Sequence, residues 1–229
     1  MTIAGERSTT DTLSGAEAAV EMLKAHGVEI LFGLCGDTSL PFYDALARLP
    51  HGMRHILARD ERSAAYMADG YARVSGKVGV CEGPSGGGVT YILPGLAEAN
   101  ESSVPLLCIN SDISVSARGR YTLTELDQGA LMRPVTKWNM VVNRAEDVPL
   151  AFRAAFKQIT TGRPGAAHIA LAISDTGANI DNVSMEKPDG AGLIAMFFSV
   201  QVRDRRQLAN VMRAVKRVPE VRRIHRART

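Results

Sequence analysis

Two stretches of the sequence place reactive or small residues where a ligand could meet them. In the first, Arg59-Asp60-Glu61, Asp60 is a candidate N-cap and Glu61 falls in the first turn of the helix that follows. A carboxylate there is stabilised in its charged form by the helix dipole, and when buried it can share a proton with a ligand nitrogen. The alternative is an ordinary first-turn acid on a solvated helix end. The second stretch, 83–88, is a glycine-rich turn that leads from an apolar segment into another helix.

The residues between and after these stretches predict the elements that position them. Apolar residues recur at helical spacing from Ala64 to Ala72, and Gly76 is a helix-ending residue. Residues 77–82 predict a short buried strand, and 89–100 predict a helix in which Pro94 is an irregularity. The glycines at 86–88 open that helix, where amide groups can bind an anion. They have neither the Lys-Ser/Thr of a P-loop nor the G-x-G-x-x-G spacing.

The run from Arg59 to Gly88 resembles the pyrimidine-binding domain of thiamine diphosphate-dependent enzymes of the acetolactate synthase and benzoylformate decarboxylase type. That family reads approximately R-H-E-x-x-A-A-x-M-A-D-G-Y-A-R-x-[ST]-G, then a strand, then T-S-G-P-G. This chain has Arg59-Asp60-Glu61, then A-A-Y-M-A-D-G-Y-A-R over 64–73, Ser75-Gly76 and P-S-G-G-G over 84–88. The resemblance covers roughly residues 12–182.

The resemblance implies that Glu61 is the catalytic residue. It would hydrogen-bond N1′ of the aminopyrimidine and favour the imino tautomer, whose 4′ nitrogen removes the C2 proton of the thiazolium; the cofactor carries the difficult chemistry and the protein tunes it. The resemblance also implies a cofactor-binding set of small residues in two turns, where glycine permits close backbone approach: Gly36, Ser85, Gly86, Gly87 and Gly88. The alternative for the glycines is turn geometry alone.

Two departures from the family pattern limit what carries over. Cys35 stands where the family's F-G-x-P-G turn has proline; Gly36 and Asp37 of that turn are weaker candidates for the pocket wall. The family often has a Phe-Gln pair before a glutamate, whereas this chain has Leu123-Thr124-Glu125, which puts a true acetolactate synthase substrate pocket in doubt. Asp127 and Gln128 are candidate substitutes for the missing glutamine. Glu82 follows a strand into the site, and we expect a structural role for it.

The family's second half holds the diphosphate through Mg²⁺ with a G-D-G segment and a later N-N, and this sequence has no such pair. We therefore expect no metal ligands here and Mg²⁺ only through a partner half. The first hypothesis is the pyrimidine half of an acetolactate synthase-like enzyme that acts on 2-keto acids, in a homo- or hetero-oligomer with a diphosphate-binding subunit. The isolated chain would then be inactive. The alternative is a truncated or rearranged domain with no turnover of its own.

Apolar strand-like segments alternate with helical ones along residues 12–182. Strands are expected at 30–33, 55–58, 77–82, 105–110, 135–142 and 168–173, with helices between them and an irregular polar stretch at 112–134. This alternation predicts an α/β fold, a mostly parallel sheet with helices on both faces. Glu61, the glycine-rich turn and the Cys35 turn all follow strands, so they can share the carboxyl edge, where ligands bind in such sheets.

The C-terminal part differs in charge from the rest. Residues 203–229 carry ten Lys/Arg and two Asp/Glu, within a chain of net charge +3. From about Gly190 the sequence is similar to the end of the ACT domain of RelA/SpoT-type enzymes: a strand near 197–202, a helix from Asp204 and a strand at 221–226. The opening strand and helix of an ACT domain are expected to be absent, with no such partner ahead of this segment. The expected organisation is a leader (1–11), the pyrimidine-binding domain (12–182), a linker (183–192) and a partial βαβ, ACT-like appendage (193–229).

Composition excludes several classes. No apolar run reaches the roughly 18 residues of a membrane span, and residues 1–12 have no apolar h-region of a signal peptide. The three cysteines have no metal spacing, so a cytoplasmic protein with reduced thiols is expected. The five histidines form no ligand spacing and are expected to be structural. The basic cluster lacks interleaved aromatics, which favours a solvated helix face over a nucleic-acid surface.

Overall fold

The computed structural model describes residues 13–172, 179–185 and 196–201, together with residues 208, 209, 212 and 216. The chain divides into two compact units, Met1–Ile173 and Ser174–Thr229. Each unit is considered by itself. The expected leader, the strand at 221–226 and most of the basic cluster fall outside the described residues.

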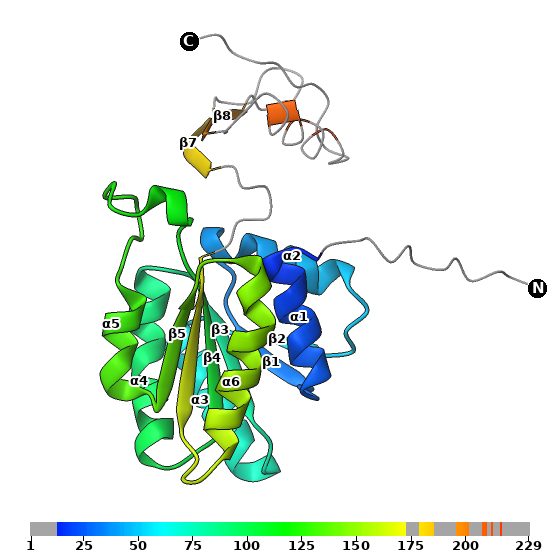
Figure 1. Ribbon diagram of the computed structural model, residues 1–229, viewed down its shortest axis with the longest axis vertical. Helices are drawn as coiled ribbons and strands as arrows, with labels where there is room; N and C mark the ends of the chain where they lie inside the picture. Colours follow the sequence, from blue (N-terminus) through cyan, green and yellow to red (C-terminus); the bar gives the residue numbers. More distant parts are fainter. Residues whose placement is uncertain are drawn as a thin grey trace, which may run out of the picture. The chain divides into compact units, whose positions relative to one another are not determined.

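The first unit is built on a six-stranded sheet whose strands run in the order β2-β1-β3-β4-β6-β5 (Figure 1). Every neighbouring pair is parallel. The strands are β1 (Ile30–Gly33), β2 (Arg54–Leu57), β3 (Gly79–Gly83), β4 (Leu106–Ser111), β5 (Trp138–Val142) and β6 (Ala166–Leu171). This parallel sheet confirms the predicted α/β fold. The bounds of the strands differ from the predicted ones by one to three residues at one or both ends, except for β1, which matches.

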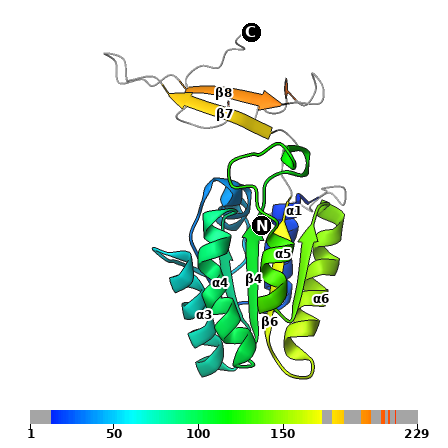
Figure 2. The same cartoon turned by 90° about the vertical axis from the view of Figure 1, so that its left-hand side faces the viewer.

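Helices cover both faces of this sheet, so two apolar cores form. Figure 2 shows β4 between α3 and α4 on one side and α6 on the other. One core joins the sheet to α1 (Gly15–Ala25), α2 (Leu40–Arg48) and α6 (Val148–Thr160). The other joins it to α3 (Glu61–Ser75) and α4 (Gly87–Glu101), with α5 (Gln128–Met132) adding Met132 and Leu131.

Local sequence signals explain where the helices begin. Ser14 and Glu17 form the capping box of α1, with Glu17 N donating to Ser14 Oγ and Ser14 N donating to Glu17 Oε2. Asp60 caps α3 by accepting from Arg62 N at 2.9 Å. The Asp60 cap is the one predicted above, and Ser14 with Glu17 has the S-x-x-E spacing that is typical of a capping box.

Small residues on α3 allow it to pack closely on the sheet and on α4. A Cβ at Gly79 of β3 would lie 2.1 Å from the carbonyl oxygen of Ala68, and a Cβ at Gly95 of α4 would lie 2.4 Å from the Cβ of Ala65. These approaches hold the N-terminus of α3 in a fixed place at the upper edge of the sheet, because the helix lies in direct backbone contact with its neighbours.

Between β4 and β5 the chain is less irregular than predicted. The segment contains the short helices η2 (Val115–Ala117), α5 and η3 (Arg133–Val135). The remaining short helices of the unit are η1 (Asp37–Ser39) and η4 (Ala145–Asp147). Helices this short leave little sequence periodicity, which explains why the pattern did not predict them.

The second unit contains an antiparallel pair, β7 (Asn179–Met185) and β8 (Met196–Gln201). The prediction that no partner strand precedes the ACT-like segment is therefore wrong. A register shift between Ile180 and Asn182 explains the miss, because an inserted residue spaces the apolar Ile180 and Val183 by three and breaks the alternation of a strand. Because β7 extends to Met185, the predicted boundary at 182 falls inside a strand. Residues 208, 209, 212 and 216 are helical, within the predicted helix.

Candidate functional site

Four chain segments meet at the carboxyl edge of the first unit's sheet, the upper end in Figure 1. They are the turn after β1, the start of α3 after β2, the glycine-rich turn after β3 and the loop after β4. Parallel strands end at the same edge, so these segments are brought together although they lie up to 90 residues apart. The predicted site residues all lie on them.

Glu61 is the first residue of α3 and is 8% exposed. Positions 83 and 88 approach it closely: a Cβ at Gly83 would lie 3.3 Å from its Cγ, and a Cβ at Gly88 would lie 3.1 Å from its Oε1. Within the described residues its carboxylate makes no hydrogen bond. Glu61 is thus an almost buried acid with free acceptor atoms, beside two positions without side chains.

The glycine-rich turn has two positions that tolerate no side chain and one that does. Gly86 has φ 67°, and a Cβ there would lie 2.8 Å from the Cβ of Thr124. A Cβ at Gly88 would lie 2.7 Å from the Cδ of Pro84, whereas a Cβ at Gly87 would meet only Tyr91, at 3.9 Å. The structure therefore separates Gly86 and Gly88 from Gly87, which the sequence pattern treats alike.

Ser85 connects the glycine-rich turn to its two neighbours. Its backbone N–H donates to Thr38 Oγ1 at 3.0 Å, and its hydroxyl donates to Thr124 Oγ1 at 2.7 Å. Thr38 follows β1 and Thr124 belongs to the loop after β4. The Ser85 side chain, predicted as cofactor-binding, is buried and takes its hydrogen-bond partner from the protein itself.

The turn after β1 packs directly on the glycine-rich turn. A Cβ at Gly36 would lie 2.5 Å from the Cβ of Pro84, so glycine is required there by contact between the two turns. Gly36 N donates to Ser39 Oγ at 3.0 Å, and Thr38 N donates to Asp37 Oδ1 at 2.8 Å. Gly36 thus belongs to the wall of the site, while the carboxylate of Asp37 caps its own turn.

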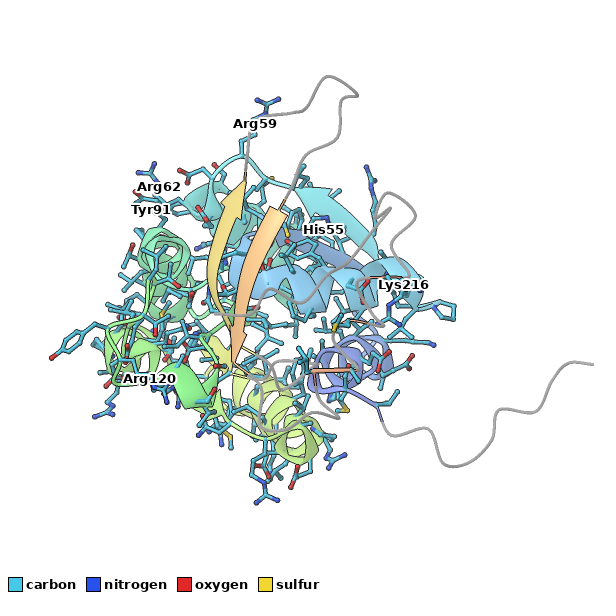
Figure 3. The ribbon with its side chains drawn as sticks, turned by 90° about the horizontal axis from the view of Figure 1, so that it is seen from above. His55, Arg59, Arg62, Tyr91, Arg120 and Lys216 are labelled. Atoms are coloured by element: carbon cyan, nitrogen blue, oxygen red, sulfur yellow. The ribbon has the colours of Figure 1, made fainter. Side chains whose placement is uncertain are left out.

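The starts of α3 and α4 also contact each other beside Glu61. The guanidinium carbon of Arg62 lies 5.7 Å from the centre of the Tyr91 ring, and Figure 3 shows these two side chains next to each other. Arg62 also forms an ion pair with Asp60 at 2.9 Å. This cation–π contact fixes the helix starts relative to each other.

The candidate substitutes for the family's glutamine have structural partners. Asp127 Oδ1 accepts from Ala130 N at 2.9 Å as the cap of α5, and the buried Gln128 donates to Ser111 O at 3.1 Å. Leu123 is 84% exposed, and Glu125 accepts from the backbone N–H groups of Gly119 and Thr122. None of these contacts points to substrate binding by Asp127 or Gln128.

Sequence reasoning missed a hydrogen-bonded cluster at the same edge of the sheet, on the face opposite to α3. Glu82 is fully buried, and Tyr43 Oη donates to its Oε2 at 2.6 Å. Tyr43 Oη also lies 3.2 Å from His55 Nε2. Burial, and to a lesser degree the charge of Glu61, raises the pKa of Glu82 to about 8. The available signal was an acid inside an otherwise apolar strand segment, V-G-V-C-E.

A cavity of about 650 Å³ lies at the other edge of the sheet and not beside Glu61. It is lined by residues that precede β1 and β3 and by the last turns of α3 and α6, among them His26, Lys77 and Phe156. Helix C-termini carry partial negative charge, which accounts for the basic residues there. Within the described residues, no group of three His, Cys, Asp or Glu could hold a metal ion.

The fold and the site define a cofactor-binding α/β domain. An almost buried carboxylate that makes no hydrogen bond to a described residue is able to share a proton with a ligand nitrogen. A family model described as "Thiamine pyrophosphate enzyme, N-terminal TPP binding domain" matches residues 13–131. The chain belongs to this family of thiamine pyrophosphate enzymes, as the sequence predicted.

Curated relatives are similar over the same region. The chain is 43% identical over 159 residues to the "Probable acetolactate synthase large subunit" of Methanocaldococcus jannaschii, covering 69% of this chain and 27% of the relative. It is 38% identical over 171 residues to "Acetolactate synthase isozyme 1 large subunit" of Escherichia coli, covering 75% and 30%. For "Acetolactate synthase large subunit" of Corynebacterium glutamicum the values are 36% over 188 residues, 82% and 30%. The chain thus spans about 30% of the length of these relatives.

A second family model, described as "ACT domain", matches residues 150–226. It confirms the predicted resemblance and extends it ahead of Gly190, into α6 and β6. In the structure β6 lies between β4 and β5 and completes the six-stranded sheet. Residues 150–171 therefore belong structurally to the first unit, although the ACT match includes them. In the described part of the chain, no helix is long and apolar enough to cross a membrane.

Proposed function

We propose that this chain binds the aminopyrimidine half of thiamine diphosphate, with Glu61 as its catalytic residue, and forms one half of an acetolactate synthase-like unit that acts on 2-keto acids. The observation that carries the proposal is the Glu61 carboxylate, almost buried, without a hydrogen bond to a described residue, and 3.1 Å from where a Cβ at Gly88 would lie. When bound, the cofactor supplies the carbon nucleophile that attacks a 2-keto acid.

The chain's own residues bind the ring and move its proton. Glu61 exchanges a proton with the pyrimidine N1′. Its place at the N-terminus of α3 favours the charged carboxylate, which can take the proton back. Gly86 and Gly88 let the turn pack closely against Thr124 and Pro84, with Gly88 next to the Glu61 carboxylate. Ser85, bonded to Thr38 and Thr124, holds the glycine-rich turn in place, which supports binding by preorganisation.

A partner half would hold the diphosphate through Mg²⁺. This part of the proposal rests on the family resemblance, in which a second half of the catalytic unit holds the metal with a G-D-G segment and a later N-N. The partner would be a separate chain with the diphosphate-binding half, in a cytoplasmic homo- or hetero-oligomer.

The second candidate is a folded domain that binds the cofactor ring but has no turnover. The exposed Leu123 and the Thr124 that contacts Gly86 favour it, because they stand where the family has its Phe-Gln pair. With this pair changed, a substrate pocket of the acetolactate synthase type is not expected.

Binding of the ring tests the role of Glu61. Thiamine is titrated into wild type, Glu61→Gln and the matched surface variant Glu101→Gln, and magnetisation transfer from protein to the pyrimidine ring proton is followed by NMR. Wild type and Glu101→Gln are expected to bind equally, and Glu61→Gln at least about tenfold more weakly, because a hydrogen bond to a charged group is lost. Circular dichroism checks that all three fold alike. Equal affinity of Glu61→Gln would exclude the assigned role.

Turnover separates the two candidates. The purified chain with thiamine diphosphate and Mg²⁺ is expected to release no carbon dioxide from pyruvate. After a diphosphate-binding half of an acetolactate synthase large subunit is added, release is expected to appear and to depend on Glu61. A complex that binds the cofactor without turnover would support the second candidate, and turnover by the chain alone would contradict the half-unit proposal.

A further inference from the structure

Glu82 is a buried acid that the proposed cofactor chemistry does not use. It lies one residue before the end of β3 with 0% of its surface exposed, and its Oε2 accepts the 2.6 Å hydrogen bond from Tyr43. Its Oε1 is buried and has no hydrogen-bond partner among the described residues. A carboxylate in this setting is costly when ionised, because one oxygen lies out of water without a donor. The neutral acid avoids that cost.

Tyr43 connects this acid to the edge of the sheet. Its oxygen lies 3.2 Å from Nε2 of His55, and the two rings meet edge to face with centres 5.1 Å apart. His55 belongs to β2, the outermost strand of the sheet, and is half-buried; it is labelled in Figure 3. A phenol has a single proton, so Tyr43 donates either to Glu82 or to His55 while it accepts from the other.

We propose that Glu82, Tyr43 and His55 form a proton relay, in which the buried carboxyl group takes up and releases its proton through the phenol and the half-exposed imidazole. In the inward step, the imidazolium Nε2–H bond of His55 breaks and its proton passes to the Tyr43 oxygen, while the proton of Tyr43 passes to Glu82 Oε2. The products are a neutral imidazole, an intact phenol and a carboxylic acid. Atoms and charge balance without another reactant.

Among the residues that the structure describes, no fixed countercharge faces Glu82. The titratable groups that face it or influence it are Tyr43 of α2, His55 of β2, Cys35 after β1, Glu61 of α3 and Cys108 of β4. Burial raises the pKa of Cys35 and Cys108 and lowers that of His55, so these groups are neutral near pH 7. Glu61 adds a negative charge. The resting state is therefore a protonated Glu82 with a neutral His55, in which Glu82 Oε2–H donates to Tyr43 and Tyr43 donates to His55 Nε2. Donation from Tyr43 to Glu82 Oε2 belongs to the ionised acid.

Gly33 leaves the space that the relay occupies. A Cβ at this position of β1 would lie 2.6 Å from Tyr43 Oη and 3.0 Å from Glu82 Oε2. The relay thus depends on a glycine in the neighbouring strand as well as on its three members. The relay stands whether or not the chain binds thiamine diphosphate.

NMR of the cofactor-free chain tests the relay independently of the proposed function. Glutamate is labelled with ¹³C at the side-chain carboxyl carbon and histidine with ¹⁵N in the ring. In wild type, one glutamate is expected to titrate near pH 8 and to be missing in Glu82→Gln. The His55 ring signals are expected to change at the same pH, because Tyr43 reverses its donation. This change of the His55 signals near pH 8 should be lost in Glu82→Gln and in Tyr43→Phe.

Tyr43→Phe distinguishes a relay from a passive contact. The Tyr43 hydrogen bond favours the charged form of Glu82, so its removal should move the Glu82 titration to higher pH. Glu101→Gln serves as the unaffected control. If Tyr43→Phe does not fold, the isosteric Glu82→Gln still decides through the His55 signals. Two results would overturn the proposal. One is a Glu82 carboxyl that titrates in the ordinary glutamate range, about pH 4 to 5. The other is a change of the His55 signals near pH 8 that persists in Glu82→Gln.

Discussion

The hydroxyl of Ser85 donates a 2.7 Å hydrogen bond to Oγ1 of Thr124 and so joins the glycine-rich turn to the loop after β4. Thr124 has φ 71°, a left-handed conformation that β-branched residues rarely adopt. Its Cβ also occupies the space next to Gly86. The contact therefore holds a strained residue over the turn that carries the site, which is where strain tends to be retained in proteins.

Two substitutions at Thr124 separate the hydrogen bond from the strain. Thr124→Ala loses the bond but keeps the positive φ, and should lower the free energy of unfolding by about 1 kcal/mol. Thr124→Gly also loses the bond but relieves roughly 1 kcal/mol of strain, so it should be more stable than Thr124→Ala. Urea denaturation of the three proteins measures this. An alanine variant more stable than the glycine variant would show that the backbone is not strained.

The glycine-rich turn offers a matched pair of substitutions. Gly87→Ala places a methyl group in ordinary contact with Tyr91 at the start of α4 and should leave stability unchanged or raise it by up to about 1 kcal/mol. Gly88→Ala forces a Cβ to within 2.7 Å of Pro84 and 3.1 Å of Glu61 Oε1, so it should lower stability and weaken thiamine binding. Thermal unfolding and the NMR titration compare the two. Equal behaviour would mean that the turn can shift to accept a side chain.

His168 should make the fold sensitive to acid. It is fully buried in β6, both ring nitrogens lack a partner among the described residues, and burial lowers its pKa to about 3. The unfolded chain takes up a proton below about pH 6.5, whereas the folded chain does not until about pH 3. Stability contributed by the neutral ring is therefore lost as the pH falls from 6.5 towards 3.

His168→Leu removes this proton uptake and keeps an apolar side chain of similar size. The variant should be at least as stable as wild type at pH 7. Its advantage should grow below pH 6.5, by up to about 1.4 kcal/mol per pH unit. Urea denaturation of both proteins at pH 7 and pH 4.5 measures the difference in their free energies of unfolding. The other titrating groups are the same in both proteins, so their contributions cancel. A stability difference that does not change with pH would show that His168 is protonated in the folded protein.

Truncation tests whether α6 and β6 belong to the first unit or to the ACT-like segment. A fragment ending at Ile173 retains the six-stranded sheet and should unfold cooperatively with an intact circular dichroism spectrum. A fragment ending at Asp147 loses α6 and β6, which pairs with both β4 and β5, and should not fold. If the shorter fragment folds as well as the longer one, the ACT match marks the true domain boundary.

Local signals were enough to predict part of this architecture. The capping box of α1, the Asp60 cap of α3 and the helix end at Gly76 each depend on residues within four positions of one another. The position of Glu61 at a helix N-terminus follows from the same stretch, as does the alternation of strands and helices that defines the α/β class. These features are encoded by neighbours in sequence, so the sequence by itself determined them.

Contacts between distant residues decided the rest. The Tyr43–Glu82 and Ser85–Thr124 hydrogen bonds each join residues 39 positions apart, and the clash that excludes a side chain at position 88 but not at 87 depends on Pro84 and Glu61. The strand β7 was hidden by a bulge that its pairing with β8 alone defines. Such features arise from where packing places two segments in space, and spacing along the chain does not encode that distance.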